Sequence, residues 1–179
     1  QVVDTRDAEA FLGCAIKGSL ALPKDMIGAY AGYFLDYDKD ILLVGDDLGH
    51  CKDANNELRR LGYDNVLGFL KGGMAHWETS AKPIEQIQLV SVDEIDDLSK
   101  DSETTLVDVR KPGEWESGII EGARTLFLGD LEDNLSEFDK DKKIVTYCGS
   151  GKRATIAASL FKKHGFENVA CFMGSMKAY

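Results

Sequence analysis

The sequence predicts an α/β fold that is built twice along one chain, each time as a small parallel sheet flanked by helices. Two observations predict it. Residues 40–66 and 143–169 align without a gap at an offset of 103 residues, and such self-similarity indicates repeated units. Each copy also contains a short β-branched run, then a segment of helical periodicity and then another apolar run. This order predicts parallel strands joined by a helix that covers the sheet.

The repeat extends beyond this core in both directions. Upstream, with one residue of slippage, Val3–Arg6 pairs with Val107–Arg110. Downstream, Gly72–Trp77 pairs with Gly174–Tyr179. Each unit is then about 75 to 90 residues long, which is small for an independent core but feasible for two units in tandem.

A proline and the polar residues after it mark the seam between the two repeats. Because Pro83 is followed by polar positions and then by a new apolar stretch, we expect a first domain over residues 1–83 and a second over residues 84–179. Ser91, with Glu94 three residues later, has the pattern of a capping box and predicts a helix just after the seam.

The second unit shows its elements most clearly. Ile144–Tyr147 is apolar or β-branched and predicts a buried strand. A helix is predicted to follow, with an apolar face made of Ile156, Ala157, Leu160 and Phe161. Gly165 is expected to end this helix, and residues 168–172 predict the next strand.

The composition and net charge limit the classes of partner that this protein can bind. Acidic residues outnumber basic ones 31 to 21, and the net charge of -10 would repel nucleic acid and anionic membranes. No apolar run approaches the roughly 20 residues of a membrane-spanning helix. The four cysteines show neither a Cys-x-x-Cys pair nor dense disulfide spacing, which fits a cytoplasmic setting. The histidine spacing offers no metal site, and we expect no cofactor in this part of the protein.

The candidate catalytic loop consists of Cys148, Gly149, Ser150, Gly151, Lys152 and Arg153. Cys148 ends the predicted strand, and the helix is expected to begin around Arg153, so loop amides and a helix N-terminus should converge on a small anion. Lys152 and Arg153 add positive charge, which favours a thiolate. Gly149 and Gly151 allow the loop to curl so that its N–H groups point inward. Such a loop can hold a persulfide.

Four segments together resemble the signature of the rhodanese family of sulfurtransferases. In chain order they are Asp108–Arg110, Glu114–Trp115, Gly118–Ala123 and Tyr147–Arg153. The resemblance implies that Cys148 takes sulfur from a sulfane donor, holds it as a persulfide and passes it to a thiol or another nucleophilic acceptor, without a cofactor. The family commonly has histidine where this sequence has Ile119, a position outside the catalytic loop, so we expect little effect on the chemistry.

Asp108 and Arg110 are candidate supports for this loop, since their side chains could orient it by hydrogen bonds. Asp4 and Arg6 repeat the same pair in the unit that lacks the nucleophile. We therefore favour a structural role for both pairs.

The first unit has no cysteine at the catalytic position. The offset of 103 places Gly45 opposite Cys148, and it places Asp46 and Asp47 within the corresponding loop. Their carboxylates would repel a persulfide or thiosulfate, so we expect the first domain to be inactive. Cys51 lies nearby but aligns inside the helix start, and we interpret it as structural rather than as a relocated nucleophile.

A narrower resemblance concerns the parent protein. Ala31–Asp38, followed by Leu42–Asp47, is similar to the first of two rhodanese domains behind a metallo-β-lactamase-fold persulfide dioxygenase. This resemblance implies an upstream domain with a non-haem iron site, and Cys148 would exchange sulfur with the substrate or product of that domain.

Two other functions stay open at this point. A cysteine phosphatase also cradles an anion in a cysteine loop that ends in arginine, but only four residues separate Cys148 from Arg153, where that resemblance would require five. A non-catalytic interaction module is the other alternative. The sequence leaves the sulfur donor and the acceptor undecided.

Overall fold

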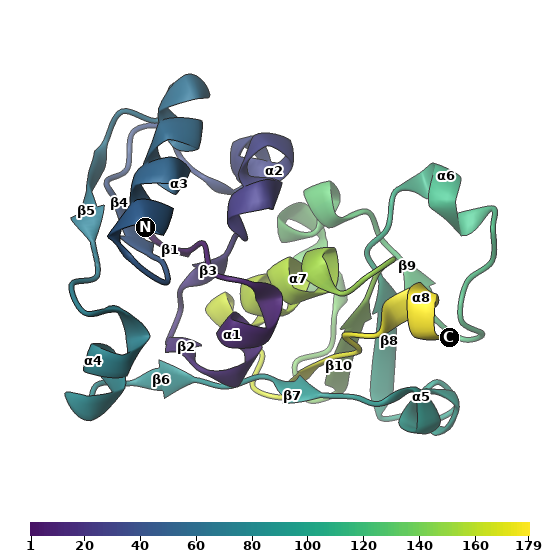
Figure 1. Ribbon diagram of the computed structural model, residues 1–179. Helices are drawn as coiled ribbons and strands as arrows, with labels where there is room; N and C mark the ends of the chain where they lie inside the picture. Colours follow the sequence, from purple (N-terminus) through teal and green to yellow (C-terminus); the bar gives the residue numbers. More distant parts are fainter. The chain divides into compact units, whose positions relative to one another are not determined.

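The computed structural model describes residues 1–179, and the chain divides into two compact units, Gln1–Gln86 and Ile87–Tyr179 (Figure 1). Each unit contains a parallel sheet flanked by helices, as the sequence predicts. None of the helices combines the length and the apolar character that crossing a membrane requires.

The sheet of the first unit has four parallel strands in the order β3-β1-β4-β5. These strands are β1 (Val2–Asp4), β3 (Leu20–Ala21), β4 (Ile41–Val44) and β5 (Val66–Phe69). A separate antiparallel pair is formed by β2 (Ala15–Ile16) and β6 (Ile84–Glu85). The helices are α1 (Ala8–Gly13), η1 (Lys24–Met26), α2 (Ile27–Phe34), α3 (Leu48–Arg60) and α4 (Gly73–Thr79).

Helix α3 follows β4 directly and packs against β4 and β5 (Figure 1). Its buried side chains, Cys51, Ala54 and Leu58, recur three and four residues apart and so lie on one face. Asp47 is the N-cap, and its carboxylate accepts the N–H of His50 at 2.8 Å. The N-terminus of α3 is therefore capped by the side chain of the residue just before it.

The sheet of the second unit has five parallel strands in the order β7-β11-β10-β8-β9. They are β7 (Gln88–Leu89), β8 (Thr104–Asp108), β9 (Arg124–Thr125), β10 (Lys143–Tyr147) and β11 (Val169–Cys171). The helices are α5 (Val92–Leu98), α6 (Pro112–Trp115), η2 (Leu128–Asp130), η3 (Glu132–Glu137), α7 (Lys152–Lys163) and α8 (Ser175–Ala178).

The elements predicted for the second unit are confirmed. β10 ends one residue before Cys148, and α7 packs against β10 and β11. The predicted apolar face of α7 is buried throughout. Gly165, at φ +85°, follows the end of α7 in a left-handed conformation that glycine adopts readily. The capping box is also present, because Glu94 accepts both the N–H and the hydroxyl of Ser91 at the start of α5.

Candidate functional site

Cys148 lies at the carboxyl end of β10, the central strand of the second sheet, immediately before the turn into α7. This is the edge where parallel α/β sheets bind ligands. Its sulfur accepts the N–H of Gly151 at 3.2 Å. Cys148 is only 1% exposed, so the sulfur lies inside the loop rather than on the surface.

Gly151 must be glycine for two independent reasons. It has φ +90°, and a Cβ there would lie 2.5 Å from both the carbonyl oxygen and the sulfur of Met173. Thr155, one turn into α7, donates its N–H and its hydroxyl to the Gly151 carbonyl at 2.9 and 3.1 Å. The loop is thus curled towards the Cys148 sulfur and fixed to the first turn of the helix.

Arg153 is held by an ion pair with Glu114, which belongs to α6. Its two terminal nitrogens reach the two carboxylate oxygens at 2.5 and 2.8 Å. The hydrogen bond with Arg153 is the main reason why the pKa of Glu114 falls to about 2. The planar fork of Arg153 thus matches a carboxylate of its own chain.

Two of the three remaining predicted loop residues, Ser150 and Lys152, lie at the rim of the site. Ser150 is exposed, and Lys152, which opens α7, is half-buried. A Cβ on Gly149 would lie 3.1 Å from a terminal nitrogen of Arg153, so Gly149 allows that guanidinium to pack closely over the loop.

Asp108 and Arg110 form a buried ion pair behind the loop, with an N–O distance of 2.7 Å. Arg110 also donates to the carbonyl oxygens of Glu114 at 3.1 Å and Gly118 at 2.6 Å. In the first unit Arg6 pairs with Asp4 at 2.7 Å and donates to the Cys14 carbonyl. The repeated pair therefore holds the chain that follows β1 in the first unit and the chain that follows β8 in the second. No hydrogen bond joins the Asp108–Arg110 pair to Cys148 itself.

Ser175, which was not among the residues expected at the site, contacts the backbone of Cys148. The Cys148 N–H donates to the Ser175 hydroxyl oxygen at 3.0 Å. The following residues add to this contact, because the N–H groups of Met176 and Lys177 donate to the carbonyls of Cys148 and Gly149. The aligned repeat contains a signal for Ser175, because its counterpart in the first unit is Gly73.

Cys171, at the end of β11, is the second cysteine near the loop. It is fully buried, and burial raises the pKa of its thiol to about 12. Cys171 therefore stays a thiol at neutral pH and is a poor nucleophile.

The corresponding loop of the first unit has no room for a nucleophile. A Cβ on Gly45 would lie 2.6 Å from the Cys51 sulfur and 3.1 Å from the His50 ring. The Asp47 carboxylate caps the helix at the end where the second unit presents the Gly151 N–H. Burial raises the pKa of Cys51, and the carboxylates of Asp47 and Asp46 raise it further. Cys51 therefore remains a thiol at neutral pH.

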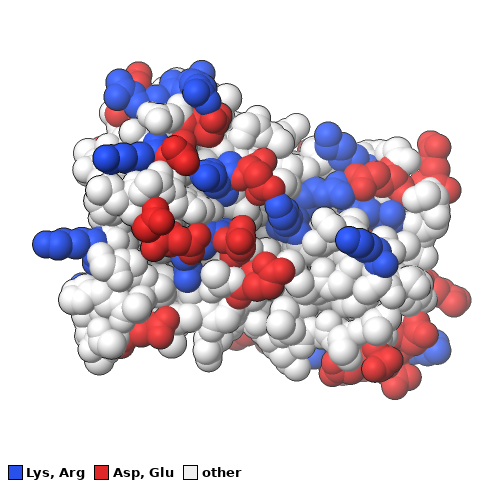
Figure 2. All heavy atoms as spheres, in the orientation of Figure 1, with Lys and Arg blue, Asp and Glu red and all other residues white.

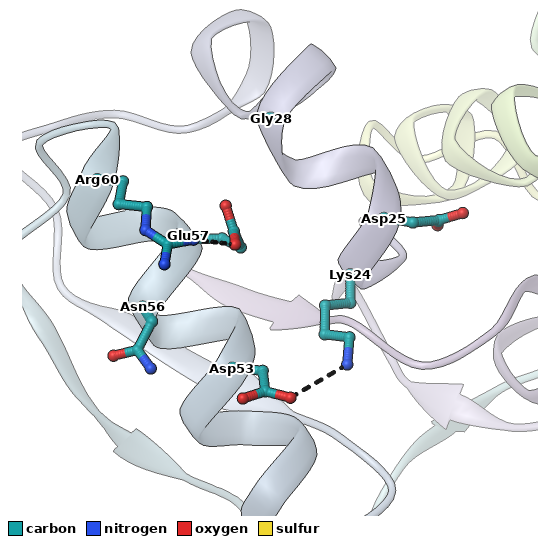
Figure 3. A pocket seen from close by; sticks show the side chains of 7 residues that line it. All are labelled: Lys24, Asp25, Gly28, Asp53, Asn56, Glu57 and Arg60. Carbon is teal, nitrogen blue, oxygen red and sulfur yellow. Dashed lines mark hydrogen bonds and ion pairs between the residues drawn. The ribbon is translucent and has the colours of Figure 1, made fainter.

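Several hollows lie on the first unit. One of about 350 Å³ is lined by the loop of Gly45, Asp46 and Asp47. Another of about 420 Å³ lies over α3 and η1, where Lys24 pairs with Asp53 and Arg60 pairs with Glu57 (Figure 3). Carboxylates pair with Lys24 and Arg60 in the larger of these two hollows. The smaller one is lined by the carboxylates of Asp46 and Asp47, so neither of the two resembles an anion site. Lys and Arg side chains are also interspersed with Asp and Glu on the face shown in Figure 2.

Comparison with known proteins adds a family match over nearly the whole chain. The model of the rhodanese-like domain matches residues 1–80 and 91–179. A Schizosaccharomyces pombe protein provisionally named as a mitochondrial thiosulfate sulfurtransferase is 30% identical over 113 residues, covering 54% of this chain and 80% of that protein. A Bacillus subtilis protein provisionally named as the sulfur carrier YrkF is 31% identical over 109 residues, covering 61% of this chain and 58% of that protein.

Two solved structures are also similar to parts of the chain or to its whole length. Reduced CoADR-RHD from Bacillus anthracis is 33% identical with a TM-score of 0.49, covering 52% of this chain and 16% of that one. Thiosulfate sulfurtransferase from Pseudomonas aeruginosa is 18% identical with a TM-score of 0.47, covering 99% of this chain and 38% of that one.

Proposed function

Because the chain belongs to the family of rhodanese-like domains, we propose that its second unit is a sulfurtransferase that carries sulfane sulfur as a persulfide on Cys148. The observation that carries this proposal is the Gly151 N–H, which donates to the Cys148 sulfur at 3.2 Å from the start of α7. A helix N-terminus and an inward-pointing amide both stabilise a thiolate or an anionic persulfide.

The reaction consists of two sulfur exchanges. In the first, the Cys148 thiolate attacks the outer sulfur of a donor such as thiosulfate; a new S–S bond forms, the donor S–S bond breaks, and sulfite leaves with the bonding electron pair. In the second, a thiolate acceptor attacks the outer sulfur of the Cys148 persulfide and leaves as a persulfide, which regenerates the Cys148 thiolate. The electrons balance without an external oxidant or reductant.

Access to the sulfur restricts the donor and the acceptor. Since Cys148 is 1% exposed, the loop admits the slender sulfane end of a donor more easily than a bulky electrophile. Thiosulfate and low-molecular-weight persulfides have this shape, and we propose them as donors, with a small thiol as acceptor. The outer sulfur of the persulfide, rather than the cysteine sulfur, is then the atom that the acceptor reaches.

The first unit is proposed to be non-catalytic. Gly45 replaces the nucleophile, and the Cys51 sulfur and the His50 ring fill the space of its side chain. In the parent protein, we propose that the tandem units act beside an upstream metallo-β-lactamase-fold domain and exchange sulfur with its persulfide substrate or product.

The experiment that tests this function is turnover of thiosulfate with cyanide, in which the persulfide sulfur leaves as thiocyanate. Cys148→Ser is expected to lower the rate at least about a thousandfold, because it removes the nucleophile. Cys51→Ser is the matched control and is expected to retain the rate. If Cys148→Ser folds and retains the rate, the proposal is wrong. If the chain without substitutions transfers no sulfur from any sulfane donor although Cys148 reacts with an alkylating reagent, a non-catalytic interaction module is favoured instead.

A further inference from the structure

Ser175 has a backbone conformation that serine adopts only at a cost. Its φ is +50°, in the left-handed region, where residues with a Cβ are strained. The counterpart in the first unit is Gly73, at φ +59°, and glycine adopts this conformation without strain. The unit that has the nucleophile therefore holds a strained serine where the unit without it has glycine.

The Ser175 hydroxyl connects the end of β10 with the chain after β11. It is fully buried, accepts the Cys148 N–H at 3.0 Å and donates to the Phe172 carbonyl at 2.9 Å. It also lies 3.9 Å from the Cys148 sulfur. A hydroxyl has one proton and can rotate, so this proton can be directed to the carbonyl or to the sulfur.

We propose that Ser175 is a positioning residue for Cys148. Its oxygen fixes the Cys148 amide, which orients the sulfur towards the Gly151 N–H, and its proton turns towards the sulfur when the thiolate forms. This inference rests on the proposed function only for the sulfur-transfer readout, because the reactivity of the Cys148 thiolate can be measured with a simple alkylating reagent.

A purely structural role does not account for the serine. Glycine would remove the backbone strain, and Gly73 occupies the same turn in the first unit. Strained residues cluster where the surrounding structure uses them, as at active sites. The contacts of the Ser175 hydroxyl with the Cys148 amide and sulfur provide such a use.

The test is Ser175→Gly, which deletes the hydroxyl and relieves the strain. Its melting temperature is expected to equal or exceed that of the parent. The alkylation rate of Cys148 by iodoacetamide, followed by peptide mass mapping across neutral pH, is expected to fall about tenfold, as for loss of one hydrogen bond to a charged group. The kcat of sulfur transfer should fall by a similar factor, with KM for thiosulfate little changed.

The matched control is Gly73→Ser in the first unit. A Cβ there meets only the Gly45 carbonyl at 3.7 Å, so the serine fits but is strained. This variant is expected to lower the melting temperature and to leave alkylation and sulfur transfer unchanged. Ser175→Ala, which keeps a Cβ but lacks the hydroxyl, should match Ser175→Gly in reactivity while being less stable.

The inference is overturned if Ser175→Gly and Ser175→Ala alkylate at the parental rate and with the parental pH profile. It is also overturned if Ser175→Gly loses reactivity only in proportion to a loss of folded protein. If the chain without substitutions accepts no sulfur, only the proposed function is contradicted. The comparison of alkylation rates would still decide the role of Ser175.

Discussion

Glu114 is the residue whose protonation affects the site most directly. The ion pair with Arg153 lowers its pKa from 4.5 to about 2. A depressed carboxyl pKa stabilises the folded state above the unfolded pKa, and this contribution is lost as the pH falls towards the folded pKa. The stabilisation by Glu114 is therefore complete above pH 4.5 and disappears towards about pH 2.

We predict that Glu114→Gln is less sensitive to acid than the parent over this interval. The Glu114 side chain is 39% exposed, so solvent screening limits its contribution to about 1 kcal/mol or less. Urea unfolding above and within the interval measures the difference. Equal losses of unfolding free energy in both proteins would show that the ion pair does not stabilise the fold.

Gly151 is the residue at which the loop tolerates no side chain. Gly151→Ala would place a Cβ at φ +90° and 2.5 Å from the Met173 carbonyl. We expect it to lower the free energy of unfolding by about 1–3 kcal/mol and to slow persulfide formation, because the Gly151 N–H moves away from the sulfur. The control is Gly113→Ala, since a Cβ on Gly113 meets nothing within 4 Å. If Gly151→Ala has the same free energy of unfolding as the unsubstituted chain and forms the persulfide at the same rate, this prediction is wrong.

At the scale of elements, the buried pair of Asp108 and Arg110 connects the end of β8 to α6. Arg110 reaches the carbonyl of Glu114, whose side chain in turn holds Arg153 of α7. The pair thus supports the candidate catalytic loop through one intermediate residue, Glu114, rather than by contact with Cys148.

We predict that Arg110→Met destabilises the second unit by about 3–5 kcal/mol, because it leaves the buried Asp108 carboxylate without its partner. Denaturant unfolding measures this cost. Arg6→Met should have a similar effect on the first unit, where Asp4 is equally buried, without changing sulfur transfer. A cost below about 1 kcal/mol would mean that Asp108 is satisfied by other groups.

The local pattern of the sequence predicts β10, the loop and α7 because each depends on neighbours along the chain. The β-branched run gives β10, the apolar spacing gives α7, and Gly165 follows the helix end. The partners of the loop come from elsewhere in the chain. Glu114 lies 39 residues from Arg153, and Ser175 lies 27 residues from Cys148, so only the folded sheet and helices bring them together.

Across the whole molecule, a parallel sheet flanked by helices occurs twice, with different loops between β4 and α3 and between β10 and α7. In the first unit the Asp47 carboxylate caps α3, and the Cys51 sulfur lies where a nucleophile at position 45 would begin. In the second unit the start of α7 faces the Cys148 sulfur. The sequence predicted the missing nucleophile and the acidic loop, but the filling of the space by Cys51 and His50 depends on side-chain packing.

We predict that Gly45→Cys does not give the first unit a working nucleophile. The new Cβ would lie 2.6 Å from the Cys51 sulfur, and the Asp47 carboxylate would still repel an anion. The variant should lose about 1–3 kcal/mol of stability and take up no sulfur at the substituted position. Peptide mass mapping after incubation with thiosulfate checks this, and a persulfide on the introduced thiol would contradict it.

We propose that this chain carries sulfane sulfur on Cys148 alone among its four cysteines. The most direct test is the intact mass of the reduced protein after incubation with thiosulfate or glutathione persulfide. We expect a gain of one sulfur, ~32 Da, that cyanide removes and that Cys148→Ser abolishes. No gain with any sulfane donor, or a gain that persists in Cys148→Ser, would contradict it.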